Sequence, residues 1–119
     1  MQMGRFIFGL WLGTTLCPSA APAKLSFNRD IRSILSENCF KCHGPDGKKR
    51  KGKLRLDVPD GPEGALVERK DGAFAIVPGD VEGGALVGKI YAKDPEERMP
   101  PPDSKLTLTE KQKDTLRRW

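Results

Sequence analysis

Residues 27–47 read FNRDIRSILSENCFKCHGPDG and are the most informative segment of the chain for its fold. Its first half has apolar residues at the spacing of one helix face, which predicts an amphipathic helix with Asn28 as the N-cap. Its second half places the only histidine of the chain, His43, directly after a Cys-x-x-Cys pair formed by Cys39 and Cys42. The GPDG sequence that follows is expected to end the helix. The apolar residues of the helix face are Phe27, Ile31, Ile34 and Leu35.

Four kinds of site could use two cysteines and a histidine at this spacing. A disulfide between Cys39 and Cys42 would close a very small loop, which gains little chain entropy and leaves His43 without a role. A thioredoxin-like redox pair normally follows a strand, and the preceding residues do not resemble one. A structural zinc site needs four ligands, and only three adjacent ones are present. Covalent haem attachment uses all three residues, because the thiols can form thioethers to the haem vinyl groups and the imidazole can bind the iron. We therefore favour haem.

A haem iron has a sixth coordination position, for which Met99 is the main candidate. There is no second histidine, and Met99 is the only methionine after residue 23. It lies in the sequence ERMPPPDS, where three prolines fix the backbone of a loop, whereas a methionine that fills a core is surrounded by apolar residues. We expect its thioether to ligate the iron. Tyr91 or a lysine is the fallback ligand, and an open position is the other alternative.

The first 23 residues have the pattern of a signal peptide. Arg5 precedes an apolar run, Phe6 to Leu16, that is shorter than the roughly 20 residues of a spanning helix. Ala21 and Ala23 are the small residues of a cleavage site. We expect export to the periplasm or another extracytoplasmic space, with an uncleaved membrane anchor as the alternative. Cys17 follows a leucine where a lipoprotein signal has a small residue, so we assign it to the removed peptide.

Cleavage after Ala23 would leave residues 24–119 as one small domain with 20 basic and 16 acidic side chains, a net charge of +4. This charge is too low to indicate nucleic-acid binding. Few large apolar residues are available, so a buried cofactor would help to fill the core. The sequence GKKRKGK at 47–53 is either a solvated loop or an electrostatic docking patch for an acidic redox partner. Its basic residues are Lys48, Lys49, Arg50, Lys51 and Lys53.

The rest of the chain predicts two further helices joined by irregular segments. The sequence PGDVEGGALVGKIYAK (78–93) favours a helix capped by Asp80, weakened by its glycines. The sequence LTEKQKDTLRRW (108–119) favours a helix with a capping box of Thr109 and Gln112. Two segments could form short extended pieces, KLRLD at 53–57 and FAIV at 74–77.

The sequence resembles the class I cytochromes c, and more narrowly the planctomycete-type cytochrome c domain. The resemblance covers residues 25–119 and rests on the blocks FNRDIRSILSENCFKCHGPD, KLRLD, AIVPGD, DPEERMPPPDSKLT and LRRW. It implies an all-α fold of about three helices, in which the first and last helices cross beside one covalently bound haem c. Matching positions make Cys39 and Cys42 the attachment residues, His43 the proximal ligand and Met99 the distal ligand.

Two features depart from the pattern of that family. Lys113 occupies a place in the last helix where the family usually has an apolar residue, which weakens the expected packing. The sequence ends at Trp119, within that helix, and the family's domain is usually the N-terminal part of a longer protein. We therefore expect residues 24–119 to be a cytochrome c domain that is truncated in its last helix.

The expected function is one-electron transfer and not catalysis, because an iron bound by both His43 and Met99 has no open position for a substrate. The expected partner is a redox donor or acceptor protein or a fused enzyme domain. No nucleic acid is expected, and a membrane only if the signal segment stays uncleaved. Two alternatives remain open: a haem relay in a larger periplasmic enzyme, and a sensing module in which Met99 dissociates. A thiol–disulfide enzyme, in which His43 is incidental, is the third.

Overall fold

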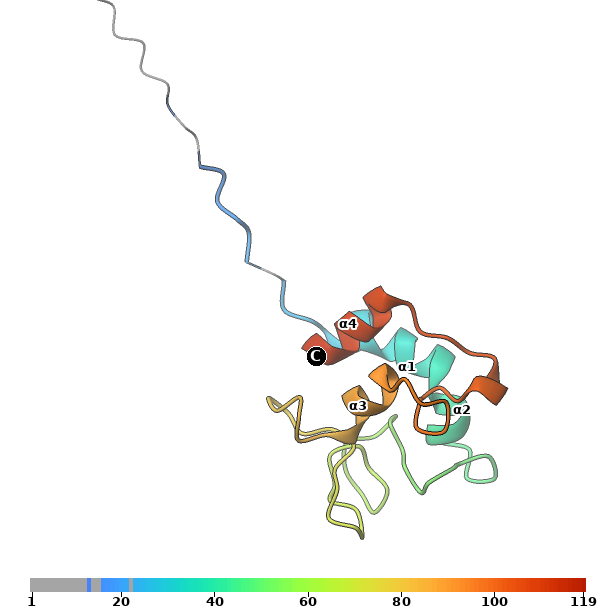
Figure 1. Ribbon diagram of the computed structural model, residues 1–119. Helices are drawn as coiled ribbons and strands as arrows, with labels where there is room; N and C mark the ends of the chain where they lie inside the picture. The colour runs from blue at the N-terminus through green and yellow to red at the C-terminus, as the bar shows by residue number, and fades with distance from the viewer. Residues whose placement is uncertain (1–12, 14–15, 22) are drawn as a thin grey trace, which may run out of the picture.

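The computed structural model describes residues 13, 16–21 and 23–119, so the expected signal peptide lies largely outside the described residues. Within the described part, the chain forms short helices and no β-strand, which agrees with the expected all-α class (Figure 1). No helix among these residues is long and apolar enough to cross a membrane. In chain order the elements are the π-helical turn η1 (Phe27–Ile31), α1 (Arg32–Asn38), α2 (Phe40–His43), α3 (Ala85–Tyr91), the 3-10 turn η2 (Pro102–Ser104) and α4 (Glu110–Arg118).

The helical path that carries the cysteines begins at η1 and continues through α1 into α2, as the apolar spacing predicts. Its start differs from the prediction, since Ser26 and not Asn28 is the N-cap residue. The backbone N–H of Ser26 donates to the Asp30 carboxylate at 2.7 Å, and the Asp30 N–H donates to the Ser26 carbonyl at 2.8 Å. This reciprocal pair closes the first turn around Asn28, which lies inside the turn, so the predicted cap is wrong.

The core is small and lies where the first and last helices meet. Helix α4 packs against η1 and α3, and Figure 1 shows it beside the start of the helical path. Three large side chains are fully buried, those of Ile31, Leu35 and Ile90. At the edge of this core, the ring centroids of Phe27 and Trp119 are 5.7 Å apart. The first and last helices are therefore in contact, as the resemblance implies.

Lys113 was expected to weaken the packing of the last helix, and the structure shows how its side chain is accommodated. The side chain is only 21% exposed, and its ammonium group pairs with the Glu110 carboxylate at 2.9 Å. The same group lies 5.7 Å from the centroid of the Tyr91 ring. The charge of this partly buried side chain thus has two favourable neighbours, which offsets part of the expected loss.

Helix α3 begins at Ala85, later than predicted, and Asp80 does not cap it. The carboxylate of Asp80 instead accepts the backbone N–H groups two and three residues ahead, at 3.2 and 3.0 Å, and so closes a separate turn. The first two N–H groups of α3 donate to the backbone carbonyls of Phe74 and Ala75, at 2.9 and 3.0 Å. The predicted cap is therefore wrong, because backbone from the segment 74–77 takes its place.

The two segments that could be extended, 53–57 and 74–77, form isolated bridges and no strand, with Arg55 opposite Gly64 in the first.

Helix α4 begins as predicted. The Thr109 hydroxyl accepts the Gln112 N–H at 3.1 Å, and the Gln112 side-chain carbonyl accepts the Thr109 N–H at 2.9 Å. This confirms the capping box.

Candidate haem site

The Cys-x-x-Cys-His motif forms one tight turn at the end of α1. The Cys39 N–H donates to the Leu35 carbonyl at 2.7 Å, which continues the hydrogen bonding of α1 into the motif. The Cys39 carbonyl then accepts two N–H groups, from Cys42 at 3.1 Å and from His43 at 2.8 Å. Residues three apart on a helix share a face, so both cysteines belong to one side of this turn. The three motif residues therefore lie together on one short turn.

Gly44 allows the chain to leave the helix directly after His43. Its backbone is extended, and a Cβ atom at this position would lie 2.2 Å from the Phe40 carbonyl oxygen. Contacts this short do not occur between a real Cβ and a backbone oxygen. A glycine is therefore required where the motif ends.

The two cysteines are free thiols and are partly buried. Burial raises the pKa of the Cys39 thiol to about 11, and the neighbouring Cys42 adds to this shift. A thiol–disulfide enzyme needs the opposite, a lowered pKa that yields a thiolate at neutral pH. The raised pKa of Cys39 thus argues against this thiol as a redox nucleophile, and both thiols are free to form another bond.

His43 has a buried imidazole nitrogen without a hydrogen-bond partner in the described part of the chain, the Nδ1 atom. Burial lowers the pKa of the ring, and the nearby backbone of Lys51 and Leu54 acts in the other direction. A neutral imidazole is the form that binds a metal, and it does so through one ring nitrogen while the other faces a backbone carbonyl. Leaving Nδ1 unpaired costs about 1–3 kcal/mol, a cost that a bond to a backbone carbonyl would remove.

The zinc alternative finds no support in this geometry. Among the described residues, no group of three or more His, Cys, Asp and Glu side chains could hold a metal ion. The two thiols and the imidazole do not point at one shared ion position. This arrangement fits a haem, which is bonded at separate atoms, better than a bare ion. The residues present therefore fit the group that the sequence predicts.

A loop that follows the motif covers His43. The Lys51 N–H donates to the Cys42 carbonyl at 2.7 Å, and the Leu56 N–H donates to the His43 carbonyl at 2.8 Å. Between these two bonds, a Cβ on Gly52 would lie 3.9 Å from the imidazole Cε1 atom. The segment 51–56 thus lies against the motif, and the His43 side chain is partly buried.

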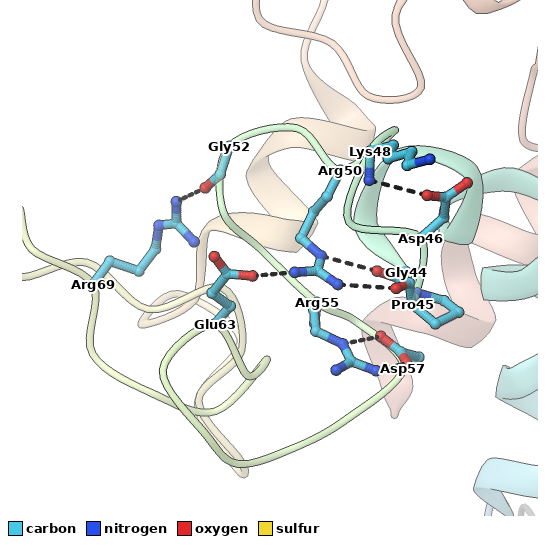
Figure 2. Close-up of polar contacts among 10 residues, drawn as sticks. All are labelled: Gly44, Pro45, Asp46, Lys48, Arg50, Gly52, Arg55, Asp57, Glu63 and Arg69. Atoms are coloured by element: carbon cyan, nitrogen blue, oxygen red, sulfur yellow. Dashed lines mark hydrogen bonds and ion pairs between the residues drawn. The ribbon is translucent and has the colours of Figure 1, made fainter.

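The sequence does not reveal the structural role of Arg50, because in sequence it looks like one more basic residue of the segment 47–53. Its guanidinium donates to the carbonyl of Gly44 at 3.0 Å, to that of Pro45 at 3.1 Å and to the carboxylate of Glu63 at 2.5 Å (Figure 2). Its side chain is only 18% exposed. Arg50 therefore joins the end of the motif to a segment more than ten residues further on.

Met99 lies in the loop between α3 and η2, and its N–H donates to the Lys89 carbonyl at 3.0 Å. It is half-buried and lines a cavity of about 360 Å³ together with Ile90, Arg98 and Lys113. None of the three motif residues lines this cavity. The structure therefore anchors Met99 but does not join it to the motif through this cavity. Tyr91, the fallback ligand, is exposed.

The comparisons with known proteins address the identity of this motif. A family model described as "Planctomycete cytochrome C" matches residues 39–103. No curated protein and no solved structure gave a significant match. The matched segment starts at the first cysteine of the motif and runs past Met99 over more than half of the chain, which therefore belongs to the planctomycete cytochrome c family.

Proposed function

We propose that this protein transfers single electrons through one haem c that is attached to Cys39 and Cys42 and ligated by His43. Membership of a cytochrome c family implies haem-based electron transfer and not catalysis by itself. The observation that carries the finer proposal is the single short turn that holds two free thiols directly before the partly buried imidazole of His43.

Haem supplies a one-electron iron couple when it is bound. The residues of the chain set the conditions for that couple. The cysteines would hold the group in place, and the partly buried ring of His43, whose pKa is lowered, would stay neutral and available as a ligand. The segment 51–56 lies against the motif and would limit the access of water to the ring, which favours a stable potential.

We further propose Met99 as the second axial ligand. Its support is the sequence, which holds no other methionine after residue 23 and no second histidine, together with the anchoring of its loop to Lys89. A thioether ligand raises the reduction potential of the iron. With both axial positions filled, electron transfer is favoured over reactions that need an open position.

We also propose that the protein is exported. The pattern of residues 1–23 supports a cleaved signal peptide, and cytochrome c domains are typically extracytoplasmic. The proposal places the electron-transfer partners in the same compartment.

The test of the ligands is an absorption spectrum of protein exported from a host that attaches c-type haem. We expect a low-spin spectrum for the wild type and a high-spin spectrum for Met99→Ala, because the alanine offers no sixth ligand. Asp103→Ala changes an exposed residue of the neighbouring turn η2 and should remain low-spin. A Met99→Ala spectrum identical to that of the wild type would contradict ligation by Met99. A folded but colourless wild-type protein would contradict the haem itself.

A further inference from the structure

We propose that the basic loop beside His43 is a docking surface for an acidic redox partner protein, an inference that rests on the proposed electron transfer. The charge of the domain is unevenly distributed. Residues 64–119 hold ten basic and ten acidic side chains, whereas residues 41–63 hold seven basic and four acidic ones. The positive excess therefore gathers around the haem motif and the loop that follows it.

Three lysines of this loop carry the unneutralised charge, and we call Lys48, Lys51 and Lys53 the lysine patch. All three are exposed, and none makes an ion pair within the described residues. Lys49 lies 3.9 Å from the Asp46 carboxylate, so part of its charge is balanced. Arg50 is balanced by Glu63 and faces inward. The patch is thus what remains for a partner after the internal pairs are formed.

The backbone beneath the lysine patch is held in place, unlike that of an ordinary solvated loop. Arg50 fixes one side through the carbonyls of Gly44 and Pro45, and Arg69 fixes the other by donating to the carbonyl of Gly52 (Figure 2). Gly52 and Lys53 both have positive φ angles, of 63° and 50°, which form a tight turn at the exposed end of the loop. The two arginines therefore fix the backbone from which the patch lysines extend.

The patch is also close to the group that would exchange electrons. The backbone of Lys51 is hydrogen-bonded to Cys42, and the neighbouring Gly52 faces the imidazole of His43. An acidic surface drawn to these lysines would approach the haem motif directly. Charge complementarity of this kind raises association rates by roughly 10- to 1,000-fold at low salt.

A partner protein fits this surface better than an anionic membrane does. Membrane binding by a few lysines needs an apolar anchor as a second contribution. The leucines of this loop are Leu54 and Leu56, and they are half-buried and buried. The loop therefore offers charge without an insertable side chain.

The first arm of the test measures the oxidation of reduced holo-protein by ferricyanide, a small anion. The patch variant combines Lys48→Glu, Lys51→Glu and Lys53→Glu. The matched control combines Lys70→Glu, Lys93→Glu and Lys111→Glu, which are exposed and change the net charge equally. At low salt we expect the rate to fall about tenfold in the patch variant and less than about twofold in the control, with the difference vanishing at high salt. Equal losses in both variants would overturn the proposal.

The second arm measures binding to immobilised poly-L-glutamate and to phosphatidylglycerol vesicles. We expect binding to poly-L-glutamate that is about tenfold weaker in the patch variant than in the control, and weaker binding to vesicles. Binding to neither probe, or patch-dependent binding that favours the vesicles, would overturn the proposal of an acidic protein partner. This arm uses the folded holo-protein. A wild-type protein without haem would refute the proposed function, whereas a holo-protein that does not bind poly-L-glutamate would refute the docking surface alone.

Discussion

Gly44 and His43 show how single residues set the geometry of the motif. The His43 side chain is partly buried, and its Nδ1 atom has no hydrogen-bond partner in the described part of the chain. The next residue, Gly44, must end the helix with an extended backbone conformation. Only a residue without a side chain can approach the Phe40 carbonyl as closely as Gly44 does. The position of the imidazole thus depends on a neighbour that makes no contact with a ligand.

Gly44→Ala should therefore destabilise the protein by roughly 1–3 kcal/mol, because the backbone must shift to make room for the methyl group. Gly47→Ala is the matched control, since a Cβ there would meet no atom within 4 Å. Denaturant unfolding of the two holo-proteins checks the difference. Equal stabilities would show that the backbone near Phe40 is free to adapt.

The ionisation of Asp57 is expected to make the free energy of unfolding depend on pH. Its carboxylate is hydrogen-bonded to Arg55 at 3.0 and 2.5 Å, and this guanidinium lowers the pKa of Asp57. A lowered pKa in the folded state means that the pair stabilises the protein above the unfolded pKa of about 4. That stabilisation is lost as the pH falls through the lower, folded value.

Asp57→Asn should accordingly lower the free energy of unfolding at about pH 7, and the difference from wild type should shrink toward zero as the pH falls through the lowered pKa of the folded state. Asp60→Asn, at an exposed aspartate nearby, should change the stability little. Unfolding curves recorded across this pH range provide the measurement. A difference between Asp57→Asn and wild type that grows as the pH falls would be incompatible with the pair described.

At the scale of elements, the helix ends differ in how far the sequence predicts them. The capping box of α4 uses side chains three residues apart, so a local pattern is sufficient to identify it. The start of α3 depends on carbonyls of Phe74 and Ala75, about ten residues earlier, and no local pattern contains that information. Asp80 looks like a cap in the sequence but closes a turn of its own.

Thr109→Ala tests the element that was predicted correctly. Loss of the hydroxyl leaves the Gln112 N–H without its acceptor and should cost about 1 kcal/mol. Thr107→Ala, at an exposed threonine outside the helix, is the control and should be nearly neutral. Chemical unfolding of both variants measures the effect. A Thr109→Ala protein as stable as its control would contradict the cap.

At the scale of the whole molecule, apolar spacing and a local motif predicted the helical path and the cysteine–histidine motif, whereas the contact between the first and last helices was implied by the resemblance to a known family. The sequence did not predict the role of Arg50, whose partners Gly44, Pro45 and Glu63 meet only once the loop is folded. The relation of Met99 to the motif belongs to the same class of long-range questions. Sequence patterns thus do not predict the contacts between segments that are distant in the chain.

The size of the core leads to a prediction for the molecule as a whole. Among the described residues only three large side chains are fully buried, so a haem held by the motif would add a large share of the apolar contact. Cys39→Ser combined with Cys42→Ser removes both attachments and should lower the Tm by more than about 10 °C, since 1 kcal/mol shifts the Tm of a domain of this size by roughly 4–8 °C. Thermal unfolding followed by circular dichroism checks this. An unchanged Tm would mean that the chain is stable without its attached group.

Covalent attachment of one haem to the motif is tested by the mass of the exported chain after denaturation. If the haem is attached, the wild type has the mass of the polypeptide plus one haem, and the double serine variant has the mass of the polypeptide alone. A wild-type mass equal to the polypeptide alone, from a host that attaches haem to a control cytochrome c, would contradict the account.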